Sequence, residues 1–125
     1  MTIVCVDNMP IMLQSLKENA DKAYPCADVQ TFLTAGPALD YAKKFGCDVL
    51  LCEINPPRLE GLFLAEKVKN INPKVNIIFV TVCSESEHAK AVMRLKPSGY
   101  LTKEATNTQI LEELHNLRYP LELIN

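Results

Sequence analysis

The chain has 125 residues, a length typical of one domain, and a formal net charge of −2. Its 48% hydrophobic and 22% charged composition is ordinary for a folded globular protein and argues against disorder. The near-zero net charge argues against a nucleic-acid-binding surface or a patch for anionic membranes within this chain. The longest apolar stretch, 75–83, is interrupted by Asn76 and Thr81 and is too short to span a membrane. The first ten residues lack the features of a secretory signal, so we expect a cytoplasmic domain without membrane contact.

Five apolar runs predict strands, separated by stretches with helical periodicity. The runs at 2–6, 48–52 and 75–82 are nearly continuous in apolar residues, as expected for parallel strands buried on both faces. The run at 28–33 alternates between apolar and polar residues, which predicts an edge strand. A short run at 99–102 completes the set of five.

Five helices are predicted between and after these strands. Pro10 and Pro37 stand at first-turn positions of the first two helices, and Asn72–Pro73 ends the third. Two capping boxes, Ser84–Glu87 and Thr106–Gln109, begin the fourth and fifth helices. Strands that alternate with helices in this way predict an α/β fold, a (βα)5 unit with a mostly parallel sheet and right-handed crossovers.

The cysteines and histidines form no metal or disulfide pattern. The cysteines are odd in number, contain no C-x-x-C pair, and in three cases lie inside apolar runs, where Cys behaves as a small hydrophobe. We interpret all five as structural thiols: Cys5, Cys26, Cys47, Cys52 and Cys83. His88 and His115 lie far apart on predicted helices, so we expect no metal role for them.

Polar side chains stand at the ends of four predicted strands. They are Asp7 and Asn8 after the first strand, Glu53 and Asn55 after the third, Thr81 at the end of the fourth and Lys103 after the fifth. Ligands bind beyond the carboxyl ends of parallel strands, so these side chains should converge on one pocket. Oxygen ligands suit Mg²⁺, and a hydroxyl with an ammonium suits phosphate oxygens. Each residue alone is explained by solvated strand ends, whereas the ordered set indicates a metal and phosphoryl site.

In this order and spacing the chain resembles the receiver domain of bacterial two-component response regulators, of the chemotaxis-regulator type, over roughly residues 2–118. The most specific segment is Glu53-Ile-Asn-Pro-Pro-Arg-Leu-Glu-Gly61, which is similar to the family's phosphoacceptor loop D-x-x-x-P-x-x-x-G. Within it, Pro57 and Gly61 fall on the family proline and glycine, and Asn55 belongs to the same acceptor loop.

Further residues carry the same resemblance. Asp7 matches one of the paired acidic residues after the first strand, and Lys103 matches the lysine that pairs with phosphate. Thr81 and Tyr100 match the switch hydroxyl and the switch aromatic residue. From the residues alone, Thr81 is equally well a buried strand residue and Tyr100 equally well plain core. For Lys103 we favour an ion pair with Glu53 or Asp7, because an unpaired ammonium in this cleft would be costly.

The resemblance implies a flavodoxin-like, doubly wound sheet with strand order 2-1-3-4-5 and a signalling role, not an enzyme activity. The implied partner is a sensor histidine kinase or another signalling protein, and the implied Mg²⁺ ligands are Asp7, Glu53 and Asn55. A homodimer is implied through the face of the fourth helix, fifth strand and fifth helix. That face offers the apolar residues Ala89, Val92, Met93 and Leu101.

Three residues depart from the family pattern. Glu53 stands where the family has the phosphoacceptor Asp, Asn8 replaces the second acidic residue, and Lys103 is followed by Glu104 instead of proline. The extra methylene of Glu53 moves its carboxylate outward by about 1.5 Å. Because phosphoryl transfer depends on positioning and electrostatics, that displacement should impair acceptance. The neutral Asn8 should weaken Mg²⁺ binding.

We therefore interpret the chain as a pseudo-receiver, in which the carboxylate of Glu53 imitates the phosphorylated state. One alternative is a phosphorylation-competent receiver with a weakened Mg²⁺ site. A flavodoxin-like small-molecule module is a second, although the chain lacks a Gly-rich loop after the first strand. A metal-dependent phosphohydrolase is a third, although no Asp-x-Asp pattern follows Asp7.

The end of the chain suggests how the domain is connected. Residues 1–118 are predicted to form the receiver domain, and residues 119–125 contain an apolar run that looks like the start of a linker. We expect the linker to lead to a C-terminal effector domain, in this family often a DNA-binding transcription regulator. Nucleic acid would then be bound only through that effector.

Overall fold

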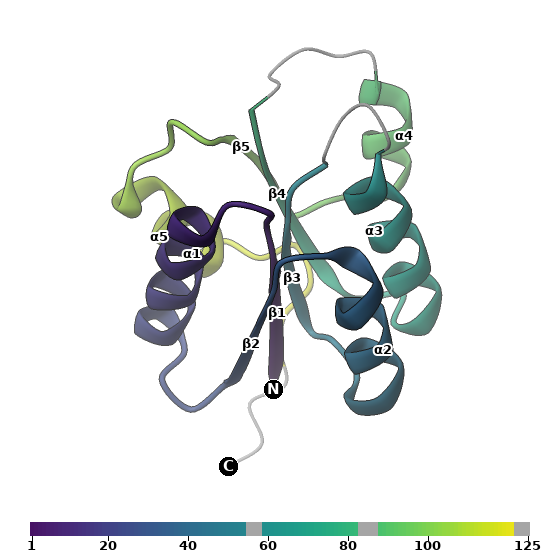
Figure 1. The fold of residues 1–125 in the computed structure, drawn as a ribbon, viewed down its shortest axis with the longest axis horizontal. Helices are drawn as coiled ribbons and strands as arrows, with labels where there is room; N and C mark the ends of the chain where they lie inside the picture. The colour runs from purple at the N-terminus through teal and green to yellow at the C-terminus, as the bar shows by residue number, and fades with distance from the viewer. Residues whose placement is uncertain (55–58, 83–87, 122–125) are drawn as a thin grey trace.

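Five strands and five helices alternate along the chain in the computed structural model, which describes residues 1–54, 59–82 and 88–121 (Figure 1). The strands are β1 (Thr2–Val6), β2 (Asp28–Phe32), β3 (Val49–Cys52), β4 (Asn76–Thr81) and β5 (Gly99–Thr102). The helices are α1 (Pro10–Ala23), α2 (Ala35–Phe45), α3 (Glu60–Ile71), α4 (Ala89–Arg94) and α5 (Asn107–His115).

All five strands are parallel and form one sheet in the order β2-β1-β3-β4-β5. This confirms the predicted fold, including the edge position of β2. The register aligns the carboxyl ends of β1, β2 and β3, because Val6 of β1 lies opposite both Phe32 of β2 and Cys52 of β3. Strand β4 continues past this level to Thr81, because Cys52 lies opposite Phe79. Thr81 of β4 lies opposite Thr102 of β5 in the same way. The residues that follow these strands are thereby gathered at the carboxyl edge of the sheet.

The helices form a layer on each face of the sheet. Helices α1 and α5 cover one face, and α2, α3 and α4 cover the other (Figure 1). Every residue of β3 and β4 is buried, as two covered faces require, whereas β2 is partly exposed. The prediction that the continuous apolar runs form buried strands is therefore confirmed for β3 and β4.

The helix boundaries follow from local sequence signals. Pro10 is the first residue of α1, and the Thr106–Gln109 capping box is formed at α5. The Gln109 amide donates to Thr106 Oγ1 at 3.2 Å, and the Thr106 amide donates to Gln109 Oε1 at 2.8 Å. The capping box predicted at 84–87 lies outside the described residues.

The cysteine prediction is correct for the buried thiols and wrong for one exposed residue. Cys5, Cys47 and Cys52 are buried and free, and burial raises the pKa of each thiol, so they remain protonated. Cys26 is also free but exposed, because it lies in the turn before the edge strand β2. Cys83 lies outside the described residues.

Within the described ranges, no helix is both long and apolar enough for a membrane crossing.

Candidate functional site

Asp7 directly follows β1 and presents a buried carboxylate at the carboxyl edge of the sheet. Its side chain is fully buried, and its Oδ1 accepts a hydrogen bond from the backbone N–H of Met9 at 2.8 Å. Met9 is the N-cap residue of α1. The turn between strand and helix therefore fixes the orientation of the Asp7 carboxylate, as a short acidic side chain commonly does at such turns.

Glu53 follows β3 and is held beside Asp7 by a close approach between β3 and α3. Its backbone N–H donates to the carbonyl of Val6 at 3.2 Å, and the residue is only 7% exposed. A Cβ atom at Gly61 would lie 1.5 Å from the carbonyl oxygen of Glu53. Only glycine fits at position 61, which gives a physical reason for the glycine that the acceptor-loop motif contains.

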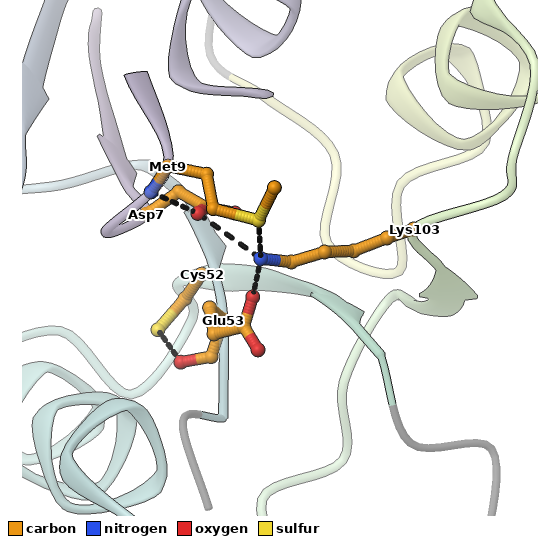
Figure 2. Close-up of polar contacts among 5 residues, drawn as sticks. All are labelled: Asp7, Met9, Cys52, Glu53 and Lys103. Carbon is orange, nitrogen blue, oxygen red and sulfur yellow. Dashed lines mark hydrogen bonds and ion pairs between the residues drawn. The ribbon is translucent and has the colours of Figure 1, made fainter. Parts of the chain in front are cut away.

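Lys103 reaches across from the end of β5 to both carboxylates (Figure 2). Its ammonium forms an ion pair with Glu53 Oε2 and lies 3.1 Å from Asp7 Oδ1. It also lies 3.2 Å from the thioether sulfur of Met9. The ion pair predicted for Lys103 is confirmed, and it involves both candidate partners.

The charges of this group are incompletely balanced. The group contains two carboxylates and one ammonium, and Asp7 Oδ2 has no hydrogen-bond donor among the described residues. Burial raises the pKa of Glu53 above its usual range, opposed by Lys103 and reinforced by Asp7. Burial acts to lower the pKa of Lys103, but its hydrogen bonds to Glu53 and Asp7 outweigh burial and raise it. The site therefore favours a protonated lysine and resists a second buried negative charge.

A small cavity of about 20 Å³ adjoins the two carboxylates, which is room for one water molecule. Its walls come from the ends of the first three strands and the starts of α2 and α3. They include Asp7, Asn8, Thr34, Glu53, Glu60 and Gly61. Asn8 itself is exposed.

Sequence reasoning missed two residues of this site, Met9 and Glu60. Met9 could have been found from its place two residues after Asp7, because Asp side chains accept hydrogen bonds from that amide. Glu60 carries no comparable local signal, since its place beside the cavity depends on how α3 packs against β3.

The predicted Mg²⁺ ligand set is only partly described. Asn55 and Pro57 lie outside the described residues. Among all the described residues, including those of this site, no group of three or more His, Cys, Asp or Glu side chains could hold a metal ion. The two described carboxylates are already bridged by Lys103, so they do not by themselves fit a divalent cation.

The two predicted switch residues lie on neighbouring strands with different exposure. Thr81 is fully buried at the end of β4, and its carbonyl accepts the backbone N–H of Lys103 at 2.9 Å. Tyr100 on β5 is 37% exposed, with its ring 6.3 Å from that of Phe79. Tyr100 is therefore not plain core. The switch roles of both residues stay predictions.

One residue of the predicted dimer face needs correction. Val92 is 5% exposed and packs in the core beneath α4, so it does not contribute to a surface. Met93, the next residue, is 68% exposed, because the rotation of about 100° per residue of a helix turns it away from the core.

Comparison with known proteins gives a consistent result over nearly the whole chain. A family model described as the response regulator receiver domain matches residues 3–115. The response regulator GacA of Pseudomonas aeruginosa is 26% identical over 97 residues, which cover 73% of this chain and 45% of that protein. The nitrate/nitrite response regulator NarL of Escherichia coli is 22% identical over 114 residues, covering 91% of this chain and 53% of that protein. The chain thus spans about half the length of the curated relatives it matches.

Solved structures show the same fold. A CheY-like receiver domain protein from Methanospirillum hungatei superposes with a TM-score of 0.80 at 24% identity, covering 91% of this chain and 90% of that one. The BeF3-activated DrrB receiver domain superposes with a TM-score of 0.78 at 21% identity, covering 91% and 93%. At these identities the structural similarity shows the fold alone.

Proposed function

The chain belongs to the response regulator receiver domain family of two-component signalling, and we propose that it acts as a pseudo-receiver. In this proposal the domain signals through its conformation and its protein contacts, with phosphorylation of Glu53 impaired or lost. The observation that carries the proposal is the Lys103 ammonium, which bridges the carboxylates of Glu53 and Asp7.

The bridge matters because a phosphoacceptor needs a free, correctly placed carboxylate oxygen. Phosphoryl transfer is catalysed mainly by placing the attacking oxygen in line and neutralising charge on the phosphoryl oxygens. Oε2 of Glu53 is committed to Lys103, and its carboxylate extends one methylene further than that of an aspartate. The same ion pair resembles the contact that a lysine would make with a bound phosphate, so Glu53 can imitate the modified state.

We propose that Mg²⁺ binds weakly or not at all. When bound, the ion would supply positive charge for the phosphoryl oxygens. Asp7 and Glu53 would hold it, but both already share the positive charge of Lys103. Asn8 is exposed and neutral, so it adds no second acidic ligand after β1.

The output of the domain is proposed to be an attached effector, most simply a DNA-binding transcription regulator. Support comes from the names of relatives, which include a transcriptional regulatory protein and a nitrate/nitrite response regulator. The proposed partner is a sensor histidine kinase or another signalling protein. A homodimer is proposed through α4, β5 and α5, with the exposed Met93 and the half-buried Leu101 as its apolar contacts. We propose that the protein acts in the cytoplasm.

One observation favours a second candidate, a phosphorylation-competent receiver with a weakened Mg²⁺ site. Asp7 Oδ2 is buried without a hydrogen-bond donor among the described residues, so one carboxylate oxygen remains available to a cation. A small-molecule module gains no comparable support at this site, because the cavity there has room for about one water molecule.

Intact-protein mass spectrometry after treatment with acetyl phosphate and Mg²⁺ tests the proposal. The wild type should gain no stable phosphoryl group, Glu53→Asp should gain one on part of the molecules, and adding Asn8→Asp should increase that fraction. Glu66→Asp, the same change on the exposed side of α3, is the matched control and should behave as the wild type. A phosphoryl group on the wild-type protein would reject the pseudo-receiver and favour the second candidate.

A further inference from the structure

Asn76 is a buried amide in a strand that is otherwise suited to apolar residues. It is the first residue of β4, an interior strand between β3 and β5, and is 1% exposed. Asparagine is disfavoured in strands, and a buried amide without partners costs about 1–3 kcal/mol. We therefore expect hydrogen-bond partners for both the NH₂ group and the carbonyl oxygen of the Asn76 side chain.

The partners are provided by the segment that follows α5. The side-chain Nδ2 of Asn76 donates to the carbonyl of Tyr119 at 2.8 Å, and Oδ1 accepts the backbone N–H of Tyr119 at 2.8 Å. One side-chain amide thus exchanges two hydrogen bonds with one residue, as two residues of paired strands do. Pro120 follows Tyr119 and favours an extended conformation there, in which N–H and C=O point to the same side.

Ser98 extends the same network to the residue before Tyr119. Its hydroxyl donates to Asn76 Oδ1 at 2.8 Å and accepts the backbone N–H of Arg118 at 3.0 Å. Ser98 immediately precedes β5, so the network joins the amino ends of two neighbouring strands to the segment after α5. In Figure 1 this yellow segment runs from α5 toward the amino-terminal end of the strands.

Side chains of the segment add contacts on two sides of the sheet. The ammonium of Lys69, on α3, donates to Tyr119 Oη at 3.1 Å and lies 4.7 Å from the centre of the Tyr119 ring. Leu117 and Leu121 pack against the core cluster beneath α1 and α5. The segment is therefore attached to both helical layers.

We infer that the amino ends of β4 and β5 form an intramolecular binding site for an extended peptide backbone, occupied by residues 117–121 of this chain, with Asn76 as its positioning residue. The site recognises an N–H and C=O pair by a side-chain amide, and an aromatic side chain by Lys69. It fixes the direction in which the chain leaves the domain, at the edge opposite the acidic site. Where the proposed effector follows, this strap sets where its linker starts; the strap itself does not depend on that proposal.

Amide hydrogen exchange at Arg118 tests the inference in the full chain. Asn76→Ala should release the strap, because two hydrogen bonds to Tyr119 are lost, and should speed exchange at Arg118 by about ten- to a hundredfold. Tyr119→Pro removes the N–H that Asn76 accepts, together with the phenol that contacts Lys69, and should have a similar effect. Asn72→Ala is the matched control, since its amide donates to the Cys47 carbonyl and accepts from the Lys74 N–H, and forms neither bond with the strap.

A second readout follows the Tyr119 phenol. Its hydrogen bond with Lys69 lowers the pKa of Tyr119, whereas the pKa values of Tyr24 and Tyr41 are raised. Ultraviolet titration should show this early-ionising tyrosine in the wild type and in Asn72→Ala, and lose it in Asn76→Ala. Exchange at Arg118 that is fast in the wild type, or unchanged in both strap variants, would overturn the inference. Neither readout involves phosphorylation, so failure here leaves the pseudo-receiver proposal intact.

Discussion

The two ends of the parallel sheet differ in the charge and the hydrogen bonding of their buried polar groups. At the carboxyl edge, Asp7, Glu53 and Lys103 bring two negative charges and one positive charge together, and one carboxylate oxygen lacks a donor among the described residues. At the amino edge, the neutral amide of Asn76 has its carbonyl oxygen bonded twice and its NH₂ group bonded once, to Ser98 and Tyr119.

The difference is the one expected between a functional site and a structural network. A satisfied neutral network rigidifies the fold, because every alternative arrangement loses hydrogen bonds in a low-dielectric interior. A charged group that is only partly satisfied is costly, and such groups are typical of sites that bind or switch. We therefore expect the amino end of the sheet to be the more rigid end, and we propose the carboxyl end as the one that responds to a signal.

The largest effect on stability is expected from a substitution that separates α3 from β3 at the charged end of the sheet. Gly61→Ala would place a Cβ atom 1.5 Å from the Glu53 carbonyl oxygen, so α3 must move away from β3. We expect a loss of about 3 kcal/mol in the free energy of unfolding, measured by urea denaturation. Gly36→Ala is the matched control, because nothing lies within 4 Å of its Cβ, and it should be neutral or stabilising by about 0.5 kcal/mol. Equal effects of the two variants would contradict the close approach at Gly61.

Removing the ammonium should have an effect of similar size, and that effect should depend on pH. Lys103→Met leaves Asp7 and Glu53 buried without a cation, so we expect about 3 kcal/mol of destabilisation near pH 7. Burial raises the pKa of Glu53, so the native state binds its proton more tightly than the unfolded state. Without the opposing ammonium the native pKa of Glu53 should rise further, so the deficit should shrink as the pH falls from the native pKa of the variant toward that of the wild type.

The wild type provides the converse test of the same ion pairs. Because the native pKa of Lys103 is raised, its stabilising contribution should be present below the unfolded value of 10.5 and be lost as the pH rises through the native value.

The control for Lys103→Met is Lys90→Met, at an exposed position of α4, which should change stability by less than about 0.5 kcal/mol. A deficit in Lys103→Met that is constant from pH 4 to about 8 would argue against the charged triad.

The smallest effect is expected at the neutral end. Ser98→Ala removes the hydroxyl that links Asn76 to Arg118, and should cost about 1 kcal/mol in denaturant unfolding. The cost should be the same at acidic and mildly basic pH, since neither partner titrates there. Ser15→Ala, which removes an exposed hydroxyl with one long contact to Asn107, should have almost no effect. A loss of stability in Ser98→Ala that depends on pH would contradict the contrast between a charged carboxyl edge and a neutral amino edge.

The carboxyl edge was more predictable from sequence than the amino edge, for a physical reason. Parallel strands put the residues that follow them at one edge, so Asp7, Glu53 and Lys103 could be grouped without a structure. Asn76 showed only as an interruption of an apolar strand, because its partner Tyr119 lies 43 positions along the chain and outside any predicted element. Tyr100 was left open for a related reason, since the exposure of a residue on an edge strand depends on what packs over it.

The most direct test of the charged end is a carbon-13 NMR titration of the Glu53 side-chain carboxyl. The ion-paired, buried carboxyl predicts a native pKa above the usual 4.5, and a further rise in Lys103→Met, where the opposing ammonium is gone. A Glu53 carboxyl that titrates at or below 4.5, and at the same pH with and without Lys103, would contradict the account of this site.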